Sequence, residues 1–113
     1  QPDCIFCRIG RGEVPAELLY RDDRVFAIKD INPKAPVHLL VIPFAHVGPL
    51  TSEPAERLAA LGALFTAAGA LALSQGLAER GYRLVVNQGP NANQEVAHLH
   101  LHLLAGRPLG AMG

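Results

Sequence analysis

Five short stretches of the chain are rich in strand-forming residues, and one long stretch has the spacing of a helix. The short stretches are residues 18–21, 25–29, 37–42, 82–86 and 97–104. Turn residues such as Asp22-Asp23 separate them, which is typical of strands joined by tight turns. Residues 37–42 are almost wholly apolar, as in a buried strand. The pattern therefore predicts five strands.

The long stretch follows Ser52 and Pro54 and ends before Gly81, residue types that mark helix ends. At about 100° per residue its large side chains share one face, which we expect to pack on the core. They are Leu58, Leu61, Leu64, Phe65 and Leu71. The opposite face is small and uncharged and consists of Ala59, Ala63, Thr66, Ala67, Ala70 and Ser74. Two interpretations remain open for it: a subunit interface, or a core helix weakened by its glycines.

No charged residue lies between Arg57 and Glu79, a length that could span a membrane. The stretch is rich in Ala and Gly, however, and it includes Thr66, Ser74 and Gln75. Because its large residues also fall on one side, the composition favours an amphipathic helix of a soluble domain.

The 113 residues suit one domain, residues 1–113, and a 50% hydrophobic share with 18% charged residues excludes disorder. A short helix, strands, a long helix and further strands predict an α+β fold. Lys and Arg total 10, as do Asp and Glu, so we expect no nucleic-acid and no membrane partner. The N-terminus lacks a basic segment followed by an apolar run, so we expect a cytoplasmic protein.

Three histidines alternate with leucines along the last predicted strand: His98, His100 and His102. Because side chains alternate across a strand, the histidines would share one face and the leucines the other. His98 and His102 would lie about 13 Å apart, too far to share a metal without a bend, whereas neighbouring histidines could share a phosphate. The alternative is a chance cluster of half-exposed histidines.

Cys4 and Cys7 form a C-x-x-C pair. A redox pair would follow the first strand of a βαβ unit, whereas here only a few residues precede Cys4. A disulfide is unexpected without a secretion signal. Two thiolates could instead supply half of a tetrahedral zinc site completed by His46 and His98. Chemistry alone supports this zinc site and a pair of buried thiols equally.

The loop before the histidines is rich in amides, with Asn87, Asn91, Asn93 and Gln94. Such side chains suit the oxygens of a phosphate or a sugar, although an ordinary polar turn has the same composition. Asp30 could accept hydrogen bonds from two ribose hydroxyls or simply begin a turn.

The sequence His-Leu-His-Leu-His-Leu-Leu at 98–104 resembles the signature of the histidine triad superfamily. Further similarity points to its branch of histidine triad nucleotide-binding (Hint) proteins and extends over nearly the whole chain. It includes residues 4–9, 30–33, 36–43, 46, 81–87 and 94–96.

The resemblance implies a five-stranded antiparallel sheet with one long and one short helix. It also implies a two-fold homodimer that extends the sheet, with the long helix at the interface. The implied activity is hydrolysis of purine nucleoside 5′-phosphoramidates or acyl adenylates to a nucleoside monophosphate such as AMP or GMP. His100 would be the nucleophile, His102 would hold phosphate oxygens, and His38 would orient His100. This chemistry needs no metal, so zinc would be structural.

The resemblance also implies a role for each of several other positions. The zinc ligands would be Cys4, Cys7, His46 and His98. Asp30 would accept the ribose hydroxyls. The apolar slot for the purine would be formed by Phe6, Ile9, Val14, Ile28 and Ile31. The loop on the phosphate side would provide Asn87, Gln94 and Glu95.

Two departures from the family pattern bear on specificity. Glu95 stands where many members have Ser or Thr, and a carboxylate there repels a phosphate unless it points away or touches a cationic leaving group. Ile28 replaces an aromatic residue of the base pocket. Three alternative functions remain: a hydrolase with a catalytic metal on the histidines, a nucleotide-binding module with little catalysis, or a dinucleoside polyphosphate hydrolase or nucleotidyl transferase of the same superfamily.

Overall fold

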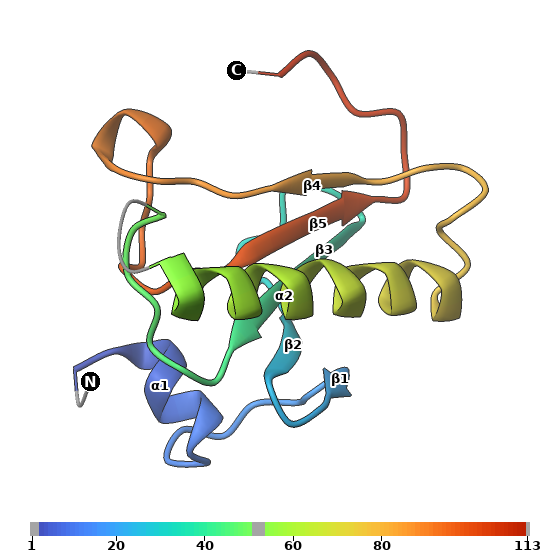
Figure 1. Ribbon diagram of the computed structural model, residues 1–113. Coiled ribbons are helices and arrows are strands. Elements are labelled where there is room, and N and C mark those ends of the chain that lie inside the picture. The colour runs from blue at the N-terminus through green and yellow to red at the C-terminus, as the bar shows by residue number, and fades with distance from the viewer. Residues whose placement is uncertain (1–2, 51–53, 113) are drawn as a thin grey trace.

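The computed structural model describes residues 3–50 and 54–112, in which five antiparallel strands form one sheet in the order β1-β2-β3-β5-β4 (Figure 1). The strands are β1 (Tyr20–Arg21), β2 (Val25–Lys29), β3 (Val37–Pro43), β4 (Arg83–Val85) and β5 (Leu101–Ala105). The helices are α1 (Ile5–Gly10), α2 (Pro54–Ser74) and the short 3-10 turn η1 (Pro90–Ala92). The predicted α+β class and five-stranded antiparallel sheet are confirmed.

The two faces of the sheet are covered differently. Residues at every second position of β2, β3 and β5 pack with α2 in the main core, among them Ala27, Leu39 and Leu103. The alternate positions face away from α2, where Phe26 and Leu40 pack with α1 in a second apolar cluster. The period of two therefore divides each strand between the main core and a second face, on which the functional site lies.

The last strand is shorter than predicted. It begins at Leu101, so His98 and His100 precede it and only His102 lies on it. The ladder between β3 and β5 begins at the pair Val41–Leu101. Beyond it, the carbonyl of Pro43 is 2.8 Å from the His98 ring and takes no part in the ladder. Leu99, Leu101 and Leu103 still face the core, as the alternation predicts, whereas Leu104 lines the cavity on the other face.

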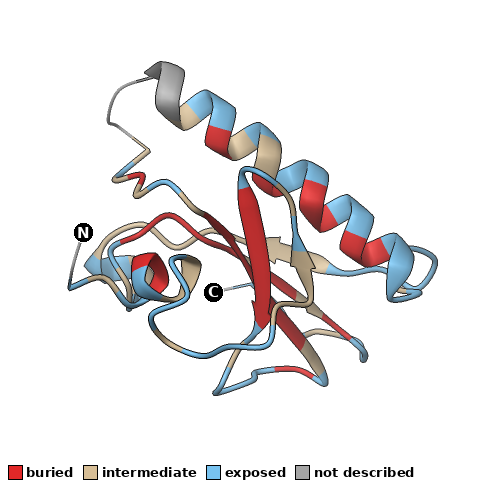
Figure 2. Cartoon of the chain, turned by 90° about the horizontal axis from the view of Figure 1, so that it is seen from below, coloured by how far each residue is buried: buried red, intermediate tan, exposed pale blue. Residues whose placement is uncertain are grey.

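The prediction for the buried face of α2 is wrong in part. Leu64 and Leu71 are buried, but Leu58 and Phe65 are 73% and 50% exposed. Alanines fill the remaining contacts with the sheet, and Figure 2 shows buried and exposed patches recurring along α2. The buried alanines are Ala60, Ala67, Ala68 and Ala72. Small side chains let the helix approach the sheet closely. The prediction considered only the size of the side chains and therefore assigned the largest residues to the core.

The helix also ends earlier than predicted, at Ser74 rather than before Gly81. Gly76 has φ +71°, a conformation that glycine adopts at little cost. The N–H groups of Gly76 and Leu77 donate to the carbonyls of Leu73 and Ala72, the pattern of a Schellman cap. The predicted start at Ser52 lies outside the described residues.

One helix in the described part of the chain, over Arg57–Ser74, is long and apolar enough to cross a membrane by length and composition. Its mean hydropathy is 1.5, and 33% of this window is buried within the fold. The core helix of a soluble protein can have the same length and composition, so the absence of a membrane partner stays a prediction.

Candidate active site and metal centre

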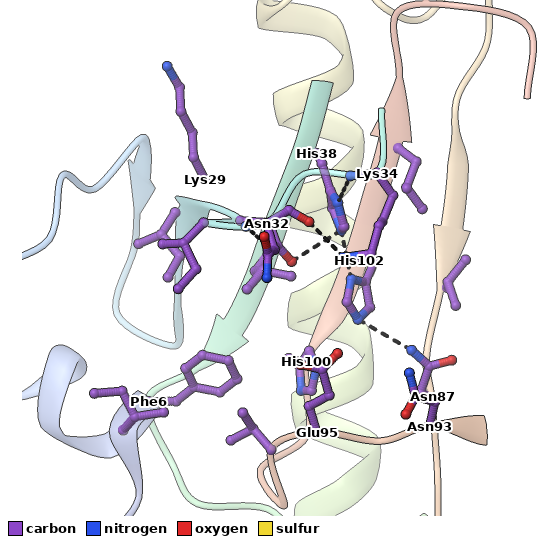
Figure 3. Close-up of a pocket in the computed structure, with 18 of the residues that line it drawn as sticks. Phe6, Lys29, Asn32, Lys34, His38, Asn87, Asn93, Glu95, His100 and His102 are labelled. Atoms are coloured by element: carbon purple, nitrogen blue, oxygen red, sulfur yellow. Dashed lines mark hydrogen bonds and ion pairs between the residues drawn. The ribbon is translucent and has the colours of Figure 1, made fainter. Parts of the chain in front are cut away.

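The face of the sheet opposite α2 holds a cavity of about 430 Å³. His38 of β3, His102 of β5 and His100 just before β5 line it together (Figure 3). Phe6 of α1 closes one side, and the loop with Asn87 closes another. A cavity of this volume with a few converging polar groups suits a small organic ligand.

His100 is held with one ring nitrogen on the backbone and the other available. The residue is 6% exposed, and its Nδ1 is 2.7 Å from the backbone carbonyl of His98. A carbonyl only accepts hydrogen bonds, so Nδ1 carries the proton and Nε2 keeps its lone pair. Neutral imidazole in this tautomer can attack an electrophile through Nε2.

His38 and His102 form a directed chain of hydrogen bonds. The backbone N–H of Lys34 donates to Nδ1 of His38 at 3.0 Å, so the proton of His38 is on Nε2. That nitrogen is 2.9 Å from Nδ1 of His102 and 3.4 Å from Oδ2 of Asp30. With His102 accepting at Nδ1, its own proton is on Nε2. The nearest group is Nδ2 of Asn87 at 3.4 Å, which is also a donor, so both N–H groups remain for a ligand oxygen. His102 therefore presents a donor to an oxygen in the cavity.

Burial keeps this pair uncharged near neutral pH. It lowers the pKa of His102 to about 4, with further lowering from the neighbouring His100 and His38. Burial also lowers the pKa of His38, although the Asp30 carboxylate opposes the shift. Both rings consequently act as neutral hydrogen-bonding groups, consistent with the tautomers described above.

The rest of the cavity wall is mostly apolar. Phe6, Ile9, Ile28 and Leu40 contribute side chains from α1, β2 and β3. Ile31 lines the mouth and is 97% exposed, a large apolar side chain without cover. A flat apolar group such as a nucleobase would bury this surface.

The loop on the other side is held by its own hydrogen bonds. Gly89 has φ +85° and Asn93 lies in the left-handed region at φ 58°. The Gln94 carboxamide accepts from the Gly89 N–H at 2.8 Å and donates to the Val96 carbonyl at 3.2 Å. Gln94 therefore shapes the loop, whereas Asn87, Asn93 and Glu95 line the cavity.

The second cluster of candidate residues lies beside the cavity and joins Cys4, Cys7, His46 and His98. One ligand atom from each lies within 4.8 Å of the others. Nδ1 of His98 is 3.2 Å from the Cys4 sulfur, and Nδ1 of His46 is 3.3 Å from the Cys7 sulfur. Two sulfurs and two ring nitrogens at such separations suit a tetrahedral zinc ion.

The surroundings of this cluster favour metal binding. Nε2 of His98 is 2.8 Å from the Pro43 carbonyl, an outer contact that leaves Nδ1 facing the thiols. Burial lowers the pKa of His98 to about 4, so its ring is a neutral ligand. Burial and the adjacent Cys4 raise the pKa of Cys7, a cost that a bound cation would offset.

The structure separates the residues singled out by the sequence into two sites and leaves some outside both. Val14 lines a different, smaller hollow, and Gln94 faces the backbone of its own loop. His38 is hydrogen-bonded to His102, whereas the carbonyl of His98 orients His100. The cavity is also lined by residues to which the sequence assigned no role, including Asn32, Lys34, Leu40 and Val85.

The fold and cavity define an α+β protein whose ligand site is lined by three histidines, one of them with an unprotonated Nε2. A model of the HIT domain family matches residues 11–109, and the chain belongs to this family. It is 46% identical over 110 residues to the purine nucleoside phosphoramidase of Escherichia coli (strain K12), covering 97% of this chain and 92% of that protein.

Two solved structures are similar in fold. A histidine triad protein from Clostridium difficile matches with a TM-score of 0.94 and 39% identity, over 100% of this chain and 98% of that one. A zinc-bound histidine triad family protein from Mycobacterium smegmatis matches with a TM-score of 0.77 and 37% identity, over 94% of this chain and 76% of that one.

Proposed function

We propose that this protein hydrolyses purine nucleoside 5′-phosphoramidates, and the related acyl adenylates, to the nucleoside monophosphate. The observation that carries the proposal is the pairing of a nucleophile with a donor at one cavity. Nε2 of His100 is unprotonated, and His102 presents an N–H to the same cavity. The centroids of the two rings are 5.0 Å apart. The 46% identity to a purine nucleoside phosphoramidase supports the same reaction.

The reaction takes two displacements at phosphorus. Nε2 of His100 attacks the α-phosphorus. In a phosphoramidate the P–N bond breaks and the amine leaves with a proton from solvent or a positioned acid, whereas in an acyl adenylate the P–O bond breaks and a carboxylate leaves. Water then attacks the nucleotidyl-histidine, the bond from phosphorus to Nε2 breaks, and the water proton goes to solvent. The His102 N–H stabilises the charge on the phosphate oxygens in both steps.

The bound nucleotide would lie along the cavity. The purine would contact the apolar wall of Phe6, Ile9, Ile28 and Ile31, and the phosphate would face His100, His102 and Asn87. Asp30 would accept the ribose hydroxyls. The Asn32 N–H donates to Oδ1 of Asp30 at 2.8 Å, which orients the carboxylate and leaves lone pairs on both oxygens.

The site of Cys4, Cys7, His46 and His98 would hold zinc as a closed structural ion, because four protein ligands leave no open position. A zinc-bound relative supports this assignment. The reaction itself requires no metal.

The assembly would be a homodimer, and the protein would be cytoplasmic without nucleic-acid or membrane partners. Strand β4 lies at an edge of the sheet, and α2 exposes Leu58, Phe65 and Leu73 on one side. A second copy could pair with this edge and cover these side chains. The balanced charge gives no attraction to nucleic acid.

The test is AMP release from adenosine 5′-phosphoramidate by the wild type and by His100→Ala. We expect turnover by the wild type and none by a folded variant that retains zinc and binds AMP. No turnover by folded wild type would refute the proposal.

The group of Asp30, His38 and His102, whose ligand atoms lie within 4.8 Å of one another, favours a metal-dependent hydrolase as the second candidate. That alternative predicts activity lost on chelation and restored by a divalent cation. The proposed mechanism predicts turnover by His38→Gln, a variant that lacks one ligand of such a group.

A further inference from the structure

His98 belongs to both sites at once. Its ring faces the thiols, with Nδ1 3.2 Å from the Cys4 sulfur and 3.5 Å from the Cys7 sulfur. Its backbone carbonyl accepts the Nδ1 proton of His100 at 2.7 Å. The side chain is 0% exposed, and Nε2 is fixed by the Pro43 carbonyl at 2.8 Å. One residue thus connects the metal ligands to the nucleophile through a single hydrogen bond.

Phe6 provides a second connection. It lies between Cys4 and Cys7 in sequence, so the same turn of chain that supplies both sulfurs also positions its ring. The ring packs edge-on against His98 and His100, with centroids 5.7 Å and 5.1 Å away. It also lines the cavity where the nucleobase would lie.

We propose that zinc at the Cys4/Cys7/His46/His98 centre strengthens nucleotide binding at the active site, with His98 and Phe6 as positioning residues. Zinc would draw α1 and His98 together. This would hold the carbonyl that orients His100 and the aromatic ring that closes the cavity. The inference rests on the proposed function, because it concerns binding at that same site.

Coupling of this kind must be reciprocal. If zinc strengthens AMP binding by some factor, AMP strengthens zinc binding by the same factor. If zinc only stabilises the fold, this factor is one, because the folded protein binds AMP with the same affinity with and without zinc. A factor that differs from one, and is equal in both directions, therefore distinguishes coupling between the sites from a merely structural role of the metal.

The first experiment measures the dissociation constant of AMP for the zinc-loaded protein, the chelated protein and Cys4→Ser. It is done at a temperature where circular dichroism shows all three folded. Cys4 does not line the cavity, so its substitution removes a zinc ligand without removing a nucleotide contact. We expect zinc removal to weaken AMP binding by about fivefold or more, and AMP to raise zinc affinity equally in a chelator competition.

Two further measurements guard against general destabilisation. Leu64→Ala opens a cavity in the core beside α2, away from both sites, and should leave the AMP dissociation constant unchanged. The Nδ1 proton of His100, followed by nitrogen–proton correlation NMR, should exchange slowly with solvent in the zinc form and faster without zinc.

Equal AMP affinity in the folded zinc-loaded and zinc-free proteins would overturn the coupling while leaving the proposed hydrolase intact. Failure of the wild type to bind zinc would overturn it as well. If AMP bound to neither form, the proposed function itself would fail. If Leu64→Ala weakened AMP binding as much as Cys4→Ser does, the effect would be one of protein stability and the coupling would be refuted.

Discussion

Nε2 of His38 lies 2.9 Å from Nδ1 of His102, and this contact sets which nitrogen of His102 faces the cavity. The backbone N–H of Lys34 determines the direction of these hydrogen bonds. The Lys34 N–H occupies Nδ1 of His38, which leaves Nε2 of His38 as the donor. His102 must then accept at Nδ1 and donate from Nε2.

Removing His38 should therefore lower the rate of the chemical step rather than nucleotide binding. In His38→Ala, Nδ1 of His102 loses its partner and the ring can take the other tautomer, so kcat should fall by about tenfold or more. His38→Gln is the matched control, because a Gln side-chain N–H can reach the position of Nε2. It should recover part of the rate. Single-turnover kinetics check this. An equal loss of rate in both variants would contradict a role for the hydrogen bond from His38 to His102.

The stability of the fold should depend on His102 between pH 6.5 and 4. Burial lowers the pKa of His102 in the folded state to about 4, against an ordinary value of 6.5. In this interval the unfolded chain binds a proton that the folded chain does not, so unfolding becomes easier as pH falls. Above pH 6.5 the contribution is complete. Denaturant titrations of wild type and His102→Gln in the same zinc state should show a shallower pH dependence in the variant. Parallel curves would show that His102 does not titrate in this way.

The alternation of His and Leu was sufficient to predict which side of the chain enters the core. Leu99, Leu101 and Leu103 are all buried there. It could not show that the strand begins only at Leu101, because strand length depends on where β3 stops pairing. The joining of Cys4 to His98 likewise depends on tertiary contacts that no local period encodes.

The face of α2 was predicted less well because size and burial diverge there. A sheet surface accepts alanines at close range, so Ala67 and Ala68 are fully buried while Leu73 is 75% exposed. Lys34, a site residue without a motif, acts through its backbone N–H, and a backbone group leaves no signal in the sequence. Val14 lies in an irregular segment where neither helical nor strand periodicity applies.

Glu95 should favour substrates whose leaving amine carries an additional positive charge. Its side chain is exposed at the cavity, and within the described part of the chain its carboxylate forms no hydrogen bond or ion pair. A carboxylate near a phosphate is favourable only toward a cationic neighbour. We expect Glu95→Gln to reduce the preference for a diamine phosphoramidate over an uncharged amine of similar size by about threefold, as for an exposed ion pair.

The control for this effect is Glu17→Gln, which removes an equal charge from an exposed position outside the cavity. It should leave the ratio of the two kcat/KM values unchanged. Equal ratios in wild type and Glu95→Gln would show that Glu95 faces away from the leaving group. A low-salt series should enlarge the difference if the charge is responsible.

The exposed apolar stripe of α2 should be the surface that a second copy covers. Leu58, Phe65 and Leu73 are 73%, 50% and 75% exposed, and their spacing of seven and eight residues places them on one side of the helix. In a two-fold dimer each substitution acts twice, so Phe65→Lys should weaken dimerisation by about a hundredfold. Sedimentation equilibrium should give a dimer mass for wild type and a monomer mass for the variant at micromolar concentration. Asp23→Lys, a charge change in the turn between β1 and β2, should remain dimeric. A monomeric wild type would contradict the assembly, since the stripe would then lie open to water in the working protein.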